Sequence, residues 1–548
     1  FDRRFEQFRR FYGGLLAWAL SHRPTVVIGF LTLVAGSCGL LLGRIGTDFF
    51  PSVDAGQIRL HVRCPAGTRL EETTRYVARV TDAIREIIPP QEIATILDNI
   101  GIPYSGINLS MSDGTMISPA DGEIFISLTE EHGPTEEYVR RLRAELPRRF
   151  PNVTFFFSAP DIATQVLNFG LSAPIDVQVS GPIQNAEANR RLAGRLRDEL
   201  ARIPGAVDVR LQQVAQTPDL RVSVDRVMAS QLGLTQRDVA SSLLISLSSS
   251  MQTAPNFWLN PANGVNYNVV VQTPQYAIRS LNDLQNTPVI PEGTANRSES
   301  TQILGNLAEV SRGVSATNVT HASIMPCFNV LMDVQDADLG SVSRAVREVI
   351  DRFQDQLPRG TRITVRGQAE SMRTSFSGLG YGLLFAVVLV YLIMVINFQS
   401  WLDPLIILMA LPGAAAGILW MLWATDTNIC VPALMGAMMS IGVATANSVL
   451  MITFANDQRK VGHNARDAAL LAGLTRLRPV IMTALAMIIG MLPMSLGLGE
   501  GGEQNAPLGR AVIGGLILAT FATLIFVPVV YSLLRTRPPR THIEEELR

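Results

Sequence analysis

The chain has 548 residues, of which 47% are hydrophobic and 17% are charged, and its formal net charge is −1 at pH 7. This composition is too apolar for an ordinary soluble enzyme and too charged for a protein that lies entirely within a membrane. The chain has no basic excess, which argues against a nucleic-acid partner. Its four cysteines form no CxxC or Cys/His pattern with metal spacing, so we expect neither a zinc site nor a cofactor. Cys64 and Cys327 could pair in an oxidising compartment, but two free buried thiols are the preferred interpretation.

Six long apolar segments indicate transmembrane helices. A helix needs about 20 apolar residues to cross a bilayer, and each segment approaches or exceeds that length. One lies near the N-terminus and five are crowded into the C-terminal region 378–534, with a large water-compatible region between them. The expected spans are 25–43, 378–396, 405–424, 432–455, 481–498 and 511–534.

The charges of the connecting segments orient these spans. Arginine and lysine gather before the first span, between residues 459 and 478, and in the tail 535–548, whereas the loops on the other side of the bundle contain almost no basic residues. Cytoplasmic loops of membrane proteins carry an excess of these residues. We therefore expect both termini in the cytoplasm and the large domain on the outer side.

Segment 1–24 is expected to form a cytoplasmic juxtamembrane helix. Phe5, Phe8 and Tyr12 recur at helical spacing against a face of arginines. This pattern is typical of a helix that lies on the inner membrane surface. A cytoplasmic extension of the first span explains it equally well.

The outer domain begins with a repeat that we assign to residues 44–170. Strand and helix patterns alternate here in the order βαββαβ, which is the split βαβ or ferredoxin-like plan. The expected elements are strand 58–62, helix 70–88, strand 93–100, strand 124–128, helix 135–150 and strand 153–157.

A second repeat of the same plan follows, but it is interrupted. Its first part, 171–232, is expected to contain strand 175–179, helix 184–203, strand 207–211 and strand 220–224. Segment 233–320 is rich in Asn, Pro and Ser and is expected to form a separate inserted lobe, since an insertion in a compact fold must loop out. The alternative is a mobile loop over 246–323. The second part, 321–370, completes the repeat with strand 329–334, helix 341–356 and strand 361–365. The fold class is thus an α+β membrane protein.

Five local motifs occur in order along the chain and resemble those of one transporter family. They are TDFFPSVDAGQ (47–57), NFQSWLDPLIIL (397–408), RLRPVIMTA (476–484), PLGRAVIGGL (507–516) and FVPVVYSLL (526–534). With the duplicated outer domain, they resemble the C-terminal half of resistance–nodulation–division (RND) efflux permeases. Within that family the chain is most similar to the hydrophobe/amphiphile, or multidrug, branch.

The resemblance implies a function and an assembly. Such permeases are secondary active transporters of the bacterial inner membrane, not enzymes, and they have twelve spans in two similar halves. This chain corresponds to the second half, so we expect the first half in the same or in a separate chain. The implied partners are amphiphilic small-molecule substrates, the lipid bilayer, a homotrimer in which 233–320 docks on neighbours, a periplasmic adaptor and an outer-membrane channel.

The resemblance also implies a proton relay in the bundle. The family places a lysine in the fourth span of this half, with arginine and threonine partners in the fifth. Arg476 and Thr483 match these partners, but Ala446 stands where the family has the lysine. The remaining relay candidates are three polar residues of the fourth span: Thr445, Asn447 and Ser448.

Several interpretations of this relay remain open. Asn447 and Ser448 could hydrogen-bond to aspartates in the other half, the coupling could be rebuilt elsewhere, or the chain could be an inactive partner. Ordinary interhelical hydrogen bonding, worth about 0.6 kcal/mol for each bond, is a further explanation.

The resemblance suggests two groups of substrate contacts. Phe155 and Phe157 share one face of a strand because side chains alternate across it, and this strand carries drug-pocket phenylalanines in the family. Plain sheet core is the alternative. Tyr104, Met111 and Met116 lie in a segment that matches a mobile loop of the family, although a solvent loop without function fits as well.

The expected function is therefore proton-driven export of hydrophobic or amphiphilic compounds. A structural partner subunit that does not couple to protons is one alternative. A metal-exporting relative, which the loop methionines also suggest, and a lipid-exporting relative are others.

Overall fold

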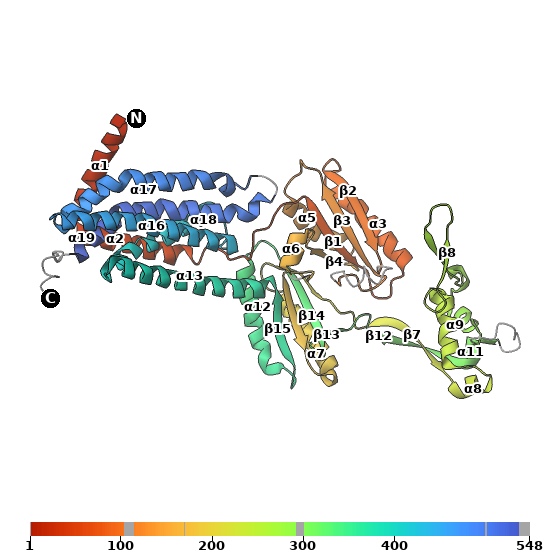
Figure 1. The fold of residues 1–548 in the computed structure, drawn as a ribbon. Helices are drawn as coiled ribbons and strands as arrows, with labels where there is room; N and C mark the ends of the chain where they lie inside the picture. Colours follow the sequence, from red (N-terminus) through yellow and green to blue (C-terminus); the bar gives the residue numbers. More distant parts are fainter. Residues whose placement is uncertain (1, 103–113, 169, 292–300, 499–500, 536–548) are drawn as a thin grey trace. The chain divides into compact units, whose positions relative to one another are not determined.

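The computed structural model describes residues 2–102, 114–168, 170–291, 301–498 and 501–535 (Figure 1). Contacts divide the chain into two compact units. Unit 1 comprises Phe1–Cys64, Leu70–Gln212 and Thr320–Arg548, and unit 2 comprises Pro65–Arg69 and Gln213–Val319. Tyr104 and Met111, two of the expected substrate contacts, lie outside the described residues.

Six helical stretches of unit 1 are long and apolar enough to cross a membrane, in the part of the chain that the structure describes. Their number and order match the expected spans, and several continue beyond them into polar ends. They are α2 (Arg23–Leu41), α13 (Gln368–Phe398), α14 (Leu402–Leu408) with α15 (Leu411–Ala424), α16 (Val431–Lys460), α17 (Ala465–Ser495), and α18 (Gly502–Phe521) with the π-helix η5 (Ala522–Phe526) and α19 (Val527–Leu534).

The N-terminal segment is a helix of its own, α1 (Asp2–Ser21), rather than a continuation of α2. His22 separates the two helices with backbone angles outside the helical region (φ −113°, ψ 46°). The Tyr12 hydroxyl donates a hydrogen bond to the carbonyl oxygen of Leu524 (2.7 Å), and Leu16 and Leu20 are buried. One apolar side of α1, which carries Tyr12, Leu16 and Leu20, therefore packs on the bundle, whereas Phe8 and Trp18 remain exposed.

Helix α18 packs against α15, α16 and α17. Figure 1 shows α16, α17 and α18 side by side. Small residues permit this close approach, as is common between membrane helices. A Cβ atom added to Gly417 of α15 would overlap the carbonyl oxygen of Gly514 of α18, and one added to Gly515 would lie 2.8 Å from the Cβ atom of Ser440 of α16. These helices therefore depend on glycine for their spacing.

The first β-sheet follows α2 in the chain and has the strand order β2-β3-β1-β4, with all neighbours antiparallel. Two helices cover one of its faces and share a core with it that includes Leu60, Val80, Ile84 and Leu142 (Figure 1). In chain order the elements are β1 (Gln57–Arg63), α3 (Leu70–Ile87), β2 (Ile93–Ile100), β3 (Asp121–Leu128), α5 (Thr135–Arg149) and β4 (Thr154–Ser158), followed by α6 (Ile162–Leu167).

The second sheet has the strand order β13-β14-β5-β15, and β6 also pairs with β14. Its core joins Val177 and Val330 of the sheet to Leu196 and Val346 of its two helices. The elements are β5 (Ile175–Ser180), η1 (Ile183–Asn185), α7 (Ala186–Leu200), β6 (Ala206–Leu211), β13 (Thr320–Ala322), β14 (Met325–Val334), α12 (Leu339–Phe353), η4 (Gln354–Gln356) and β15 (Arg362–Gly367).

Unit 2 begins earlier than the inserted lobe that we expected. Strand β7 (Thr217–Val224), expected in the second repeat, pairs instead with β12 (Ala308–Ser315) along its whole length. Its backbone groups find their partners there, so the strand belongs to the insertion. The boundary lies at Gln213 rather than at residue 233.

The other described residues of unit 2 form helices, strands and a core, in contrast to the mobile-loop alternative. Leu234, Val239, Val289 and Leu307 form a small core. The remaining elements are α8 (Arg226–Gln231), α9 (Gln236–Ser248), the hairpin β8 (Asn256–Leu259) and β9 (Asn266–Val269), η2 (Gln275–Ala277), α10 (Leu281–Gln285), β10 (Pro288–Val289), β11 (Gln302–Ile303) and α11 (Leu304–Leu307).

Candidate functional site

Two pairs of polar side chains connect α16 to its neighbours inside the bundle. The Thr483 hydroxyl of α17 lies 3.1 Å from Oδ1 of Asn447 and can donate to it. The hydroxyls of Ser448 and Thr523 lie 3.0 Å apart. Asn447, Ser448 and Thr523 are all buried. Three of the expected relay residues therefore take part in contacts that join α16 to α17 and to η5.

Thr523 was not among the expected relay residues. It lies in η5, where one turn of the last span is a π-helix. Single π-helical turns are rare in proteins, and those that occur are often found at functional sites. The sequence around Thr523 is an ordinary apolar run, so no pattern in it would have revealed the turn.

The structure does not bring Thr445 or Arg476 into these pairs. The Thr445 hydroxyl lies 2.8 Å from the carbonyl oxygen of Gly442 in its own helix. The Arg476 guanidinium lies over the Phe454 ring at 5.2 Å, and its Nε atom has no hydrogen-bond partner among the described residues. Arg476 precedes Thr483 by seven residues, which is about 10 Å along a helix axis.

A second polar cluster lies on the face of the first sheet that its helices do not cover. We call it the polar sheet face and define it as Arg59, His61 and Arg63 of β1, Asp121 and Glu123 of β3, and Phe156 of β4. The pairing of β1 with β3 and β4 sets these side chains on one face, since residues two apart in a strand point the same way.

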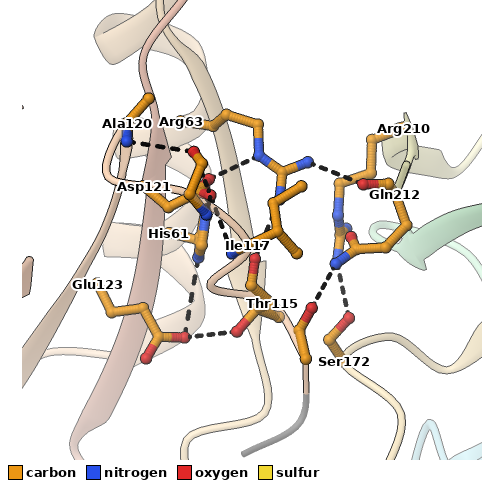
Figure 2. Close-up of polar contacts among 12 residues, drawn as sticks. His61, Arg63, Thr115, Ile117, Ala120, Asp121, Glu123, Ser172, Arg210 and Gln212 are labelled. Atoms are coloured by element: carbon orange, nitrogen blue, oxygen red, sulfur yellow. Dashed lines mark hydrogen bonds and ion pairs between the residues drawn. The ribbon is translucent and has the colours of Figure 1, made fainter. Parts of the chain in front are cut away.

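Ion pairs and hydrogen bonds bind the polar sheet face together (Figure 2). Nε2 of His61 lies 3.0 Å from Oδ1 of Asp121, and Nε of Arg63 donates to the same oxygen at 2.7 Å. Arg59 donates to Oε1 of Glu123 at 2.6 Å. His61 and Asp121 are fully buried.

These contacts keep both carboxylates ionised. Burial opposes the charge of Asp121, but the hydrogen bond from His61 and the charge of Arg63 outweigh it and hold the pKa below its usual range. For Glu123 burial is likewise outweighed, by His61 and Arg59, so its pKa is also lowered. Both carboxylates are therefore ionised at every physiological pH.

Residues of the second sheet and its flanks complete this cluster. The Arg210 guanidinium lies 3.6 Å from the centre of the Phe156 ring, on which the His61 ring also stacks at 4.2 Å. Arg210 donates to the Ser172 hydroxyl at 3.0 Å, and the Gln212 amide donates to the Gly114 carbonyl oxygen at 2.7 Å (Figure 2). The arrangement places an aromatic ring against the Arg210 guanidinium and the His61 ring, a surface suited to apolar and anionic parts of a ligand.

No group of three or more His, Cys, Asp or Glu side chains is arranged to hold a metal ion in the described part of the chain. On the polar sheet face, arginine already occupies the carboxylates that a cation would need. The four cysteines are free thiols, as preferred from the sequence, and burial raises the pKa of Cys327 to about 12.

The expected contacts Phe155 and Phe157 lie on the opposite side of the sheet. Phe157 is paired with Leu60 and Phe155 with Val62, and both phenylalanines belong to the core beneath α3 and α5. Both therefore take the position of sheet core, the alternative that the sequence left open, because the register of β4 turns Phe156 to the polar side. Met116 is also buried.

The alternation on β1 is a signal that could have identified the polar sheet face. Arg59, His61 and Arg63 alternate with the apolar Ile58, Leu60 and Val62, which predicts a strand with one polar face. No such pattern identifies Arg210 as part of this cluster, because Arg210 lies in β6 of the second sheet.

Comparison with known proteins gives a consistent result. The model of the AcrB/AcrD/AcrF family matches residues 1–535. The chain is 25% identical over 530 residues to the cation efflux system protein CzcA of Alcaligenes sp. (strain CT14), covering 96% of this chain and 48% of that protein. It is 27% identical over 540 residues to the multidrug resistance protein MdtC of Yersinia enterocolitica, covering 95% and 48%. The chain thus spans about half the length of these relatives.

A solved structure shares the fold. The crystal structure of a heavy metal efflux pump, crystal form II, superimposes with a TM-score of 0.81 at 24% identity, and the match covers 97% of this chain and 52% of that one.

Proposed function

The chain belongs to the AcrB/AcrD/AcrF family of RND permeases, and from this premise we propose that it forms half of an inner-membrane pump that exports hydrophobic or amphiphilic compounds. The proposed mechanism is alternating access driven by a proton gradient. The polar pairs in the bundle and the polar sheet face are the two features that support this proposal.

The polar sheet face is the observation that carries the proposal. Phe156 offers an aromatic surface, and Arg210 and His61 lie against it. A ligand with an apolar ring and an acidic or strongly polar group complements these side chains. Because the cluster is buried, a ligand enters only when the segments around Ser172 and Gln212 separate from the first sheet, which is a movement of the kind that alternating access supplies.

Metal export is the second candidate, because two of the similar proteins are described as cation or heavy-metal efflux systems. A cation at the polar sheet face would have to displace Arg63 from Asp121 and Arg59 from Glu123. Breaking buried ion pairs of this kind is costly. This argument favours the amphiphile.

The proposed proton coupling uses Asn447 and Ser448 in place of the lysine that Ala446 replaces. Both side chains are already hydrogen-bonded within this chain, to Thr483 and Thr523. Protonation of carboxylates in another segment of the pump would change the hydrogen bonds that Asn447 can form. A structural partner that is not coupled to protons is the alternative.

The proposed assembly is a homotrimer in the bacterial inner membrane, with the sheets in the periplasm and with a periplasmic adaptor and an outer-membrane channel as partners. The first sheet has four antiparallel strands and the second has five, and each packs against two helices, which supports our inference that they are two copies of the ferredoxin-like plan. The exposed hairpin of unit 2 supports a role in contacts between subunits.

Phe156→Leu tests the proposed substrate site. The test measures export of an aromatic anionic dye and of an anionic detergent from cells that carry the complete pump, alongside accumulation of zinc and cobalt. We expect Phe156→Leu to reduce amphiphile export at unchanged membrane levels, because leucine keeps apolar volume but loses the aromatic face. Phe155→Leu, one residue along on the core side, is the matched control and should retain export.

Two outcomes would contradict the proposal. If Phe155→Leu loses export and Phe156→Leu keeps full export, the substrate site lies on the opposite face of the first sheet. Metal accumulation that rises in Phe156→Leu cells, with unchanged amphiphile export, would favour the metal exporter.

A further inference from the structure

A crevice of about 910 Å³ lies between three helices of the bundle, α2, α15 and α18. It is separate from the relay pairs and from the polar sheet face. Its walls are formed mainly by apolar and glycine residues, among them Gly29, Gly36, Gly417, Met421 and Gly514.

Two different uses of glycine shape this crevice. Gly417 and Gly514 are in contact across α15 and α18 and form a tight crossing. Gly29 and Gly36 of α2 have no such contact, because a Cβ atom added to either would meet no atom of the described chain within 4 Å. Packing within the described chain therefore does not require glycine at these two positions of α2. Because glycine has no side chain, the crevice is wide there.

Two polar side chains that line the crevice, Ser37 and Trp420, need no hydrogen bond from a ligand. The Ser37 hydroxyl donates to the Leu33 carbonyl oxygen at 2.6 Å and accepts a hydrogen bond from Nε1 of Trp420 at 2.9 Å. Both side chains are thus satisfied within the protein. An apolar crevice between membrane helices, whose Ser37 and Trp420 side chains already have hydrogen-bond partners, excludes water and suits a hydrocarbon chain.

A basic residue and two tryptophans mark one end of the crevice. Ile45, just beyond α2, and Leu422, near the end of α15, belong to one apolar cluster, so these helix ends lie together. Arg44 is exposed at this end, and none of the described residues gives its guanidinium a hydrogen bond or ion pair. Trp420 and Trp423 lie on α15 with ring centroids 5.6 Å apart. Tryptophan gathers at the level of lipid headgroups, and arginine binds phosphate.

We propose that this crevice binds a membrane phospholipid, with one acyl chain between α2, α15 and α18 and an anionic headgroup at Arg44. The acyl chain matches the apolar walls, and the anionic headgroup supplies a partner for Arg44, which has none among the described residues. An amphiphilic substrate or an apolar helix of another polypeptide could enter the same space. Neither of these occupants explains why Arg44 lies at the same end of the crevice as Trp420 and Trp423. The proposal does not depend on the compound that the pump exports.

Photolabelling in vesicles tests the proposal. The complete protein is reconstituted into phosphatidylethanolamine and phosphatidylglycerol that includes a phosphatidylglycerol with a photoactivatable acyl chain, and the labelled residues are mapped by mass spectrometry. We expect labelling of α2 and α15 residues that line the crevice, with competition by excess unlabelled phosphatidylglycerol.

Gly36→Leu should abolish this labelling by filling the crevice. Gly39→Leu is the matched control, because Gly39 lies on the same helix, also has open space around it and does not line the crevice. Arg44→Gln should weaken labelling by phosphatidylglycerol more than labelling by a phosphatidylcholine probe, whose headgroup carries a phosphate but no net charge. Thermal unfolding of each variant checks that the bundle remains folded.

Three results would overturn the proposal. Equal labelling of the Gly36→Leu and Gly39→Leu proteins would show that the crevice holds no lipid. Competition by an exported dye rather than by phosphatidylglycerol would assign the crevice to substrate. Cross-linking of the Gly36→Cys protein at that thiol to another polypeptide would assign the crevice to a partner helix.

Discussion

At the scale of single residues, substitutions at the contact between Asn447 and Thr483 distinguish a role in proton coupling from ordinary helix packing. Under the proposed function, Asn447→Ala should abolish proton-driven export because it removes the amide that stands beside the missing lysine. Membrane insertion should be unaffected, since a span inserts more easily without a polar group. Thr445→Ala is the control, because its hydroxyl bonds only within its own helix. Dye efflux from energised vesicles is the measurement.

Other substitutions refine this test. Thr483→Val should reproduce part of the defect, since it removes the hydroxyl that donates to Asn447. Arg476→Ala should impair efflux less, because Arg476 takes no part in the pair. Full efflux by the Asn447→Ala protein would show that Asn447 only forms an interhelical hydrogen bond and has no role in coupling.

The lowered pKa values of Asp121 and Glu123 predict a stability that depends on pH. A carboxylate whose pKa is lowered in the folded state stabilises that state above its unfolded pKa, which is about 4. This stabilisation is lost as the pH falls from there through the folded pKa. Asp121→Asn should remove part of this acid dependence and lower the free energy of unfolding by about 3 kcal/mol near neutral pH, because Arg63 is left unpaired.

Unfolding of the purified protein in detergent, followed by circular dichroism over a range of pH, measures both effects. Asp336→Asn provides the control, because the ion pair of Asp336 with Arg140 is exposed on both sides. Such a pair contributes about 0–1 kcal/mol. Identical acid profiles for the wild type and Asp121→Asn would contradict the assignment.

At the scale of elements, the crossing of α15 and α18 depends on two glycines. Gly417→Ala places a methyl group against the Gly514 carbonyl oxygen and 2.9 Å from the Cβ atom of Leu518. The helices must move apart, and overpacking of this kind typically costs about 1–3 kcal/mol. We expect a lower midpoint of thermal unfolding, whereas Gly39→Ala, with open space around it, should leave the midpoint unchanged. An unchanged midpoint for Gly417→Ala would mean that the crossing adapts freely.

At the scale of the whole molecule, the hairpin of β8 and β9 predicts contact with another subunit. Phe257, Trp258 and Tyr267 are about half exposed on it. Exposed apolar groups of this kind mark interaction sites. In the complete pump, cysteine at position 262, in the turn between the strands, should yield an inter-subunit product with a bifunctional thiol reagent.

The control for this experiment is a cysteine at the exposed position 231, also in unit 2 but outside the hairpin. The products are separated by gel electrophoresis under denaturing conditions. Intramolecular products alone from position 262 would contradict the proposed docking role.

The sequence by itself determined the features that local patterns encode. Apolar segments long enough to cross a bilayer predicted the six candidate spans, because length and hydropathy are properties of a continuous segment. The alternation and helical periodicity over 57–157 predicted each strand and helix of the first sheet to within a few residues. The motifs predicted the family that the comparisons show.

Only the tertiary structure decided which segments meet. Three consecutive phenylalanines carry no alternation, so the pairing of β4 with Leu60 and Val62 alone decided that Phe156 faces the polar cluster, and a shift of one residue would reverse this. Strand β7 belongs to unit 2 because its partner β12 lies far along the chain. The contacts of Ser448 with Thr523 and of Phe156 with Arg210 likewise join distant segments. Such contacts depend on how helices and sheets pack, which no local pattern encodes.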